Sequence, residues 1–246
     1  MKIKDQGPSV LTRPVFLKET QYLLEHLKTL SYGQAKDLWA CSQSLANENY
    51  ERLETMDLSK NLSPAILTYE GIQYKYMAPM VFTEEMYKYI NKHLRILSGF
   101  YGVLKPFDGI TTYRLEMQAK LDTEKGKDLY EFWGDKLYKE LVSDNSTKGQ
   151  LIINLASDEY GKTIEKYLKP EDQFVTIIFG EYKKDKNGEP KVITKGTYAK
   201  MARGEMVRYM AENQIVDIES LKKFTVGGFA CLESQCDDNK IVFVRS

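Results

Sequence analysis

Apolar side chains recur at helical spacing in the first quarter of the chain. Between residues 15 and 30, leucines stand three and four positions apart, which predicts a helix with one apolar face. Ser31 and Gln34 have the spacing of a capping box, so a second helix is expected to begin there. A third helix is expected over residues 44–56, and the run Ala-Ile-Leu-Thr-Tyr after Pro64 predicts a short strand.

The middle of the chain alternates between helical and extended patterns. Thr83 precedes two glutamates and an apolar series that repeats as far as Leu97, which predicts a capped helix ending at Ser98 and Gly99. Residues 113–117 alternate like a strand. Residues 127–141 carry apolar side chains at spacings of four and predict one helix.

The C-terminal part has the pattern of a sheet with a helix between its strands. Residues 151–155 read as a buried strand, and residues 173–179 and 191–196 as two strands that flank the turn sequence Asp-Lys-Asn-Gly at 185–188. A helix over residues 198–213 and a last strand pair, 224–231 with 241–244, are expected to follow. The hairpin makes part of the sheet antiparallel. We therefore predict an α+β fold, a compact single domain over residues 1–246 in which helices flank a mixed sheet.

Composition restricts the partners without identifying one. The 246 residues carry 35 Lys and Arg against 35 Asp and Glu, so any nucleic-acid surface has to be local. The three cysteines and the lack of a recognisable signal peptide predict free thiols in a reducing cytoplasm. No apolar run approaches the roughly 20 residues of a membrane-spanning helix, so we expect no membrane association. His26 and His93 are far in sequence from Cys231 and Cys236, which predicts no structural metal and no cofactor.

The stretch from His93 to Met117 combines glycines, aromatic residues and cations at one predicted connection. Close-approach backbone N–H groups beside positive side chains suit a phosphate. The alternative is a glycine helix cap followed by a tight turn with solvated cations. If the connection binds nucleic acid, the expected contacts are Arg95, Ser98, Gly99, Tyr101, Gly102, Lys105 and Arg114.

Two further segments carry candidate phosphate contacts. Lys200, Arg203 and Arg208 lie within an arc of roughly 140° on the helix that begins near Tyr198, although solvated surface cations give the same pattern. Ser157 and Lys162 stand at the strand-to-helix junction that follows residue 154, where Asp158 and Glu159 also offer acid–base chemistry. Ordinary capping by Ser157 is the alternative there. The sequence has no motif of an activated nucleophile, so we predict no catalytic residue.

Five motifs resemble those of the peroxide-stress protein YaaA family, and the similarity runs from about Pro14 to the end of the chain. Their occurrence in one order makes the resemblance specific. The motifs are His-Leu-Arg-Ile-Leu-Ser-Gly-Phe-Tyr-Gly-Val-Leu-Lys-Pro-Phe-Asp from His93, Tyr-Arg-Leu-Glu-Met from Tyr113, Lys-Asp-Leu-Tyr-Glu-Phe-Trp-Gly-Asp from Lys127, Asn-Leu-Ala-Ser-Asp-Glu-Tyr from Asn154, and Tyr-Ala-Lys-Met-Ala-Arg-Gly from Tyr198.

The resemblance implies a cytoplasmic bacterial protein of the hydrogen peroxide stress response that binds DNA and limits free iron and oxidative DNA damage. It also implies a compact mixed fold with a helix-hairpin-helix-like element, which the Gly99 turn would supply, and a positively charged cleft. The start of the chain departs from the family pattern. Members usually begin with an apolar strand that runs into Ser-Pro-Ala-Lys, whereas Met1-Lys2-Ile3 here runs into Lys4-Asp5-Gln6-Gly7.

Three functions are consistent with these residues. The leading one is a protein that grips the phosphates of duplex DNA with little sequence preference, which requires Arg95, Lys105, Arg114, Lys200 and Arg203 to converge on one concave face. The second is an enzyme acting on a nucleotide or another phosphorylated small molecule. The third, an iron-sequestering protein, requires a ligand cluster for which the sequence shows no spacing.

Overall fold

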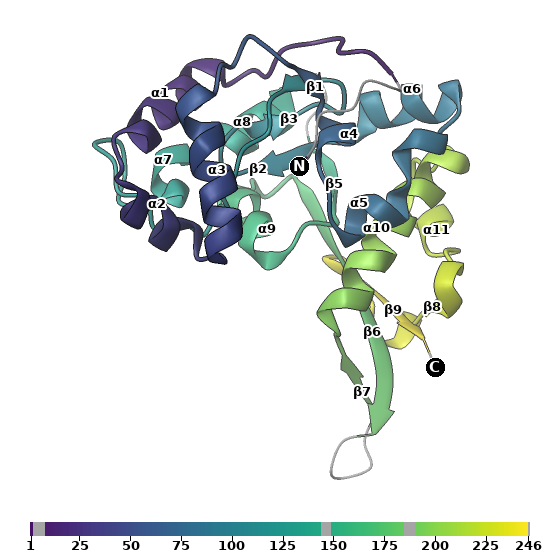
Figure 1. Cartoon of the computed structure of the whole chain (residues 1–246). Helices are drawn as coiled ribbons and strands as arrows, with labels where there is room; N and C mark the ends of the chain where they lie inside the picture. Colours follow the sequence, from purple (N-terminus) through teal and green to yellow (C-terminus); the bar gives the residue numbers. More distant parts are fainter. Residues whose placement is uncertain (2–7, 144–148, 185–189, 246) are drawn as a thin grey trace. The chain divides into compact units, whose positions relative to one another are not determined.

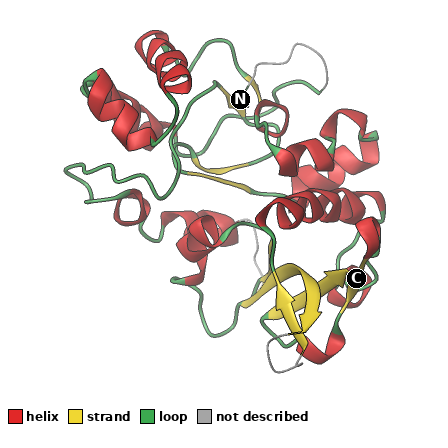
Figure 2. Cartoon of the chain, turned by 60° about the horizontal axis from the view of Figure 1, so that its bottom comes forward, coloured by secondary structure: helices red, strands yellow, loops and turns green. Residues whose placement is uncertain are grey.

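The computed structural model describes residue 1 and residues 8–143, 149–184 and 190–245 (Figure 1). The chain forms two compact units. Unit 1 contains Met1–Tyr69, Leu94–Ser146 and Ala156–Leu168, and unit 2 contains Glu70–His93, Thr147–Leu155 and Lys169–Ser246. Helices and strands mix in both, and the strands of unit 2 make a sheet with both parallel and antiparallel pairs, so the predicted α+β class is confirmed (Figure 2). One domain over residues 1–246 stays a prediction.

The three predicted N-terminal helices are confirmed in unit 1. They are α1 (Leu17–Lys28), α2 (Tyr32–Trp39) and α3 (Gln43–Thr55). The predicted capping box begins α2, because Gln34 N donates to Ser31 Oγ and Ser31 N donates to Gln34 Oε1 at 2.9 Å. The leucines that predicted α1 form its buried face.

The strand predicted after Pro64 is wrong. Ser63 and Pro64 form β1 (Ser63–Pro64), which pairs with β4 (Gly109–Ile110), and the apolar run that follows is the short helix α4 (Ala65–Thr68). All four residues of α4 are buried, including the polar Thr68, so the run has no alternation of apolar and exposed positions from which a helical period can be read.

The helix predicted to end at Ser98 and Gly99 is shorter than expected. Helix α6 (Glu84–His93) begins with the predicted contact of Met86 N to Thr83 Oγ1, at 3.4 Å, and ends before residue 94. The next residues form β2 (Ile96–Ser98), which pairs antiparallel with β3 (Gly102–Leu104). The Gly99 turn therefore joins two strands, and the helix-hairpin-helix-like element expected there is not formed.

Two other predictions in unit 1 need correction. Residues 113–117 are not a strand: Leu115 and Met117 are buried and Glu116 is exposed, but none of the described residues pairs with this segment in a ladder. The single helix predicted over residues 127–141 is broken at Gly134, where φ is +51°. Its two parts are α7 (Leu129–Trp133) and α8 (Lys136–Ser143), and α9 (Asp158–Glu165) completes the helices of the unit.

Unit 2 is built on a sheet with the strand order β5–β6–β9–β8, and β7 pairs with the far end of β6. The predicted hairpin and last strand pair are confirmed as the antiparallel pairs β6–β7 and β8–β9, while β5–β6 and β6–β9 are parallel. The turn sequence at 185–188 lies outside the described residues. The first strand is confirmed but only partly buried, because it lies at the edge of the sheet. The strands are β5 (Leu151–Asn154), β6 (Gln173–Lys184), β7 (Pro190–Ile193), β8 (Phe229–Cys231) and β9 (Lys240–Arg245).

The helix predicted over residues 198–213 is α10 (Gly196–Glu212), which packs on this sheet and against α5 (Ile72–Met77). Val175, Ile177 and Phe179 of β6 meet Ala202 and Met206 of α10 in the core of the unit. The remaining helical segments of unit 2 are α6, α11 (Ile218–Leu221) and the 3₁₀ turns Pro79–Val81, Val226–Gly228 and Glu233–Gln235. Among the described residues, no helix has the length and apolar character needed to span a membrane.

Candidate nucleic-acid interface

The Gly99 turn lies inside unit 1. The Ser98 hydroxyl accepts hydrogen bonds from the backbone N–H groups of Phe100, at 3.1 Å, and Tyr101, at 2.8 Å, and it lies 2.6 Å from the Tyr113 hydroxyl. Ser98 and Tyr101 are each 1% exposed. The donors and the hydroxyl that suggested a phosphate loop are therefore used by the turn itself.

The glycines of this turn are required by packing. A Cβ at Gly99 would lie 2.7 Å from the carbonyl oxygen of Leu115, and one at Gly102, where φ is +76°, would lie 2.8 Å from the Phe16 ring. Trp133 Nε1 donates to the Gly99 carbonyl oxygen at 2.9 Å. Ser98, Gly99, Tyr101 and Gly102 are buried, which leaves almost no surface for the DNA phosphate predicted to contact them.

Tyrosine hydroxyls form hydrogen bonds beside this turn. The Tyr113 hydroxyl is shared between Ser98 and Tyr69, at 2.6 Å from each, and Tyr101 Oη accepts from Thr111 N at 3.2 Å. Burial raises the pKa of Tyr113 well above its usual value, and burial also raises the pKa of Tyr101. These phenols stay protonated at neutral pH and serve as hydrogen-bonding groups of the core.

The three predicted cations of this region are half-buried and not fully exposed to solvent. Arg95 Nη1 donates to the Leu94 carbonyl oxygen at 2.9 Å. Arg114 Nη2 forms an ion pair with Glu116 Oε1 at 3.1 Å, and the Arg114 side chain is 29% exposed. Lys105 lies between buried residues of the chain that follows β3. The positive charge on this side of the turn is therefore partly compensated within unit 1.

Arg114 borders a hollow of about 730 Å³ in unit 1. Its lining includes Lys120 but also the acids Asp37, Glu116 and Asp122, so its charge is mixed. Neither Ser157 nor the other residues of the predicted phosphate-enzyme pocket, Asp158, Glu159 and Lys162, line this hollow. It gives no support to an enzyme built on those residues.

The predicted contacts on α9 differ from each other in exposure. Ser157 is the N-cap residue of α9, yet its side chain makes no capping hydrogen bond, so ordinary capping by its hydroxyl is not observed. Lys162 is exposed, and its Nζ lies 4.2 Å from the centre of the Tyr130 ring. Glu159 is engaged with the protein, because its Oε1 accepts from Gln118 N at 3.2 Å.

The three predicted cations of α10 also have different surroundings. Lys200 is exposed and forms no ion pair with another described residue. Arg203 is half-buried. Arg208 Nε forms an ion pair with Glu212 Oε1 at 2.7 Å, which compensates its charge. Lys200 is therefore the one of the three best placed to meet a phosphate.

A second group of lysines lies on the two-stranded end of the sheet, which we call the β6–β7 ribbon (residues 182–184 paired with 190–192). These residues of β6 pair with β7 and not with β9, and Figure 1 shows the ribbon running past the ends of β8 and β9. Lys183 and Lys191 are direct partners in the ladder, both exposed. Like charges directly opposite each other destabilise a strand pair, so the ribbon carries a charge repulsion that a phosphate would relieve.

The base of the β6–β7 ribbon carries a compensated pair of cations. Lys195 Nζ and Arg245 Nη2 bind the two oxygens of Glu181, at 2.6 and 3.0 Å, and Arg245 stacks on Tyr198 at 3.6 Å. The hydrogen bond from Lys195, and to a smaller extent the one from Arg245, holds the pKa of Glu181 below its usual value. This cluster fixes the ribbon to the start of α10, near Lys200.

The predicted convergence of five cations joins Arg95, Lys105 and Arg114 of unit 1 with Lys200 and Arg203 of unit 2. It stays a prediction. Lys183 is not among the residues predicted from the sequence, because its position opposite Lys191 depends on the register of the hairpin. The run of lysines on either side of the turn sequence was the available signal.

Comparison with known proteins gives consistent matches along the chain. A family model described as "Peroxide stress protein YaaA" matches residues 1–235. A "UPF0246 protein" of Desulfitobacterium hafniense is 52% identical over 233 residues, which cover 95% of this chain and 89% of that protein. A "UPF0246 protein" of Lactiplantibacillus plantarum is 49% identical over 244 residues, 99% of this chain and 95% of that protein.

Proposed function

Because the chain belongs to the peroxide stress protein YaaA family, with a role in the response to peroxide, we propose that it acts there as a DNA-binding protein that limits free iron and oxidative DNA damage. Iron that stays near DNA turns peroxide into damaging radicals, so occupancy of the duplex and a lower iron level protect the same target. The phosphate contacts that we assign lie on unit 2.

The observation that carries the proposal is the pair of facing lysines on the β6–β7 ribbon. The major groove of duplex DNA admits a two-stranded ribbon. Lys183 and Lys191 on the ribbon, with Lys200 on the adjoining helix, provide three exposed ammonium groups without an ion pair to any other described residue. Ammonium groups act as point charges on phosphates, which supports binding with little sequence preference.

Replacing Lys183 and Lys191 together with alanine is expected to weaken binding to duplexes of unrelated sequence about equally. Each lost phosphate contact should lower the slope of log K against log salt by about 0.9, and affinity by about tenfold at 0.1 M salt. Fluorescence-anisotropy titrations at several salt concentrations measure both quantities. Lys200→Ala removes one contact, so it should lower the slope by about 0.9 and the affinity by about tenfold.

The matched control is Lys88→Ala, which removes an exposed lysine of unit 2 that is already paired with Glu84 at 2.9 Å. Its affinity and salt slope should equal those of the unchanged protein. If the double variant also binds like the unchanged protein, the DNA site lies elsewhere. If the unchanged protein has no salt-sensitive affinity for DNA, the function is not DNA binding, and a phosphorylated small molecule becomes the better candidate ligand.

A further inference from the structure

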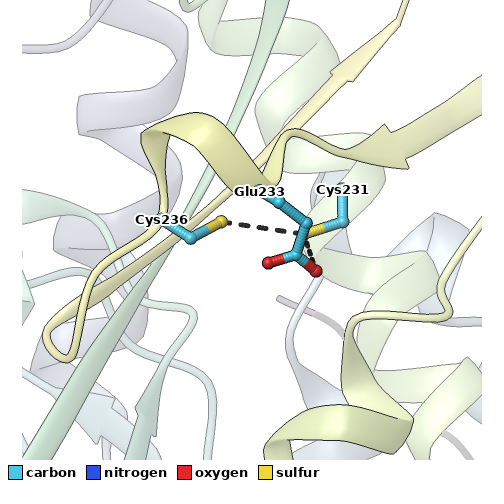
Figure 3. Close-up of side chains that lie close together, drawn as sticks. All are labelled: Cys231, Glu233 and Cys236. Atoms are coloured by element: carbon cyan, nitrogen blue, oxygen red, sulfur yellow. Dashed lines mark hydrogen bonds between the residues drawn. The ribbon is translucent and has the colours of Figure 1, made fainter.

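Two thiols and a carboxylate of unit 2 point toward one another at the end of β8 (Figure 3). Cys231 ends β8, Glu233 begins the 3₁₀ turn Glu233–Gln235, and Cys236 follows this turn. Cys231 Sγ lies 3.6 Å from Cys236 Sγ and 3.7 Å from Glu233 Oε1. One ligand atom from each residue lies within 4.8 Å of the other two.

The two separations that involve Cys231 match the edges of a tetrahedral zinc site. With Zn–S bonds of about 2.3 Å and Zn–O bonds of about 2.1 Å, tetrahedral angles place two sulfurs about 3.8 Å apart, and a sulfur and an oxygen about 3.6 Å apart. The observed distances of 3.6 Å and 3.7 Å lie within about 0.2 Å of these values. The third separation, between Cys236 and Glu233, is no more than 4.8 Å. The spacing of Cys231 from each of its two neighbours therefore suits a shared cation.

The surrounding chain holds these donors in place. Leu232 N donates to the Val242 carbonyl oxygen at 2.8 Å, and Val242 N donates to Cys236 Sγ at 3.4 Å, so the turn is bound to β9 on both sides of Glu233. Lys222 Nζ binds Glu233 Oε2 at 3.2 Å and leaves Oε1 directed toward the sulfurs. Backbone N–H groups donating to sulfur and a partner on the second carboxylate oxygen are the outer contacts that metal ligands use.

Both cysteines pack against the hydrophobic core of unit 2 and are only partly exposed. Each thiol gives up its proton when it binds a cation, and the cation then compensates the negative charge of the crowded donors.

We propose that Cys231, Glu233 and Cys236 form a binding site for Zn²⁺. Two thiolates select a thiophilic cation over Mg²⁺ or Ca²⁺, and a carboxylate as third ligand suits Zn²⁺. Three protein ligands leave the fourth position to water or to a ligand from a partner. The expectation of no structural metal rested on cysteine–histidine spacing, whereas the third donor proposed here is the glutamate inside Cys-x-Glu-x-x-Cys.

Zinc is expected to bind the reduced, chelator-treated protein with one ion per chain and to protect two of its three cysteines. We would count alkylated cysteines by intact mass, in a phosphine reductant, without and with one equivalent of Zn²⁺. The count should fall from three to one, because Cys41 lies in unit 1 and outside the cluster. Bound Co²⁺ should show a thiolate-to-metal charge-transfer band that Zn²⁺ removes.

Substitutions test the assignment of the ligands. Cys231→Ser and Cys236→Ser should each abolish the Co²⁺ band, Glu233→Gln should weaken zinc binding about tenfold or more, and Cys41→Ser should bind like the unchanged protein. Circular dichroism checks that each variant is folded. Two results would overturn the proposal. One is alkylation of all three cysteines of the unchanged protein in the presence of zinc, and the other is zinc affinity that survives the combined substitution of Cys231 and Cys236 by serine. The protection measurement uses the unchanged protein, so a variant that fails to fold does not weaken the test.

Discussion

Replacing Gly204 with alanine is expected to destabilise the protein by about 3 kcal/mol or more. Gly204 lies on α10 where this helix crosses α5, and an added Cβ would overlap the carbonyl oxygen of Gln73 and lie 2.8 Å from Met77 N. Both obstacles are backbone atoms, so the two helices have to separate to admit a methyl group. Urea denaturation followed by circular dichroism measures the loss.

Gly196→Ala is the control for this prediction. Gly196 is on the same helix, and a Cβ added there would have no described atom within 4 Å apart from those of its chain neighbours and the adjacent backbone of α10. The free energy of unfolding should stay within about 0.5 kcal/mol of the original, or rise slightly, because alanine favours a helix. Equal midpoints for the Gly204 and Gly196 variants would mean that α5 and α10 do not pack as closely as described.

Replacing Trp133 with alanine is expected to cost about 3–5 kcal/mol in unit 1. Trp133 is fully buried, lies against the Phe16 ring with centroids 5.5 Å apart, and binds the Gly99 carbonyl oxygen through its indole N–H. The substitution opens a cavity and leaves that carbonyl oxygen without its donor. The measurement is again urea denaturation followed by circular dichroism.

Phenylalanine substitutions separate the hydrogen bond from the volume. Trp133→Phe keeps most of the ring but loses the bond to Gly99, so it should cost about 1–3 kcal/mol. Trp39→Phe is the matched control, because Trp39 is 5% exposed and its Nε1 has no hydrogen-bond partner among the described residues. It should cost less than Trp133→Phe, and the reverse order would contradict the structural role assigned to the Gly99 turn.

Elements with local signals could be predicted from the amino-acid sequence. The capping box at Ser31 and the helical spacing of leucines up to Leu27 predicted the first helices, because a helix satisfies its hydrogen bonds within one segment. The hairpin of β6 and β7 could also be predicted, since its two strands lie next to each other in the sequence. The motif order also predicted the family, which the comparisons confirm.

Which of the candidate residues are exposed depends on contacts between segments that are distant in the sequence. Ser98 and the glycines beside it look like a phosphate loop in the sequence, but Leu115 and Trp133, distant along the chain, fold over them. A buried turn and an open loop need the same small residues, so local pattern cannot separate them.

The pairings of the candidate functional side chains also depend on the folded sheet. Lys183 faces Lys191 because of the strand register, and Glu233 reaches Cys231 because a 3₁₀ turn bound to β9 brings it back over the strand end. Register and turn geometry depend on hydrogen bonds to other strands. Those bonds exist only once the sheet of unit 2 has formed, which is why the lysine pair and the thiol cluster could not be derived from spacing alone.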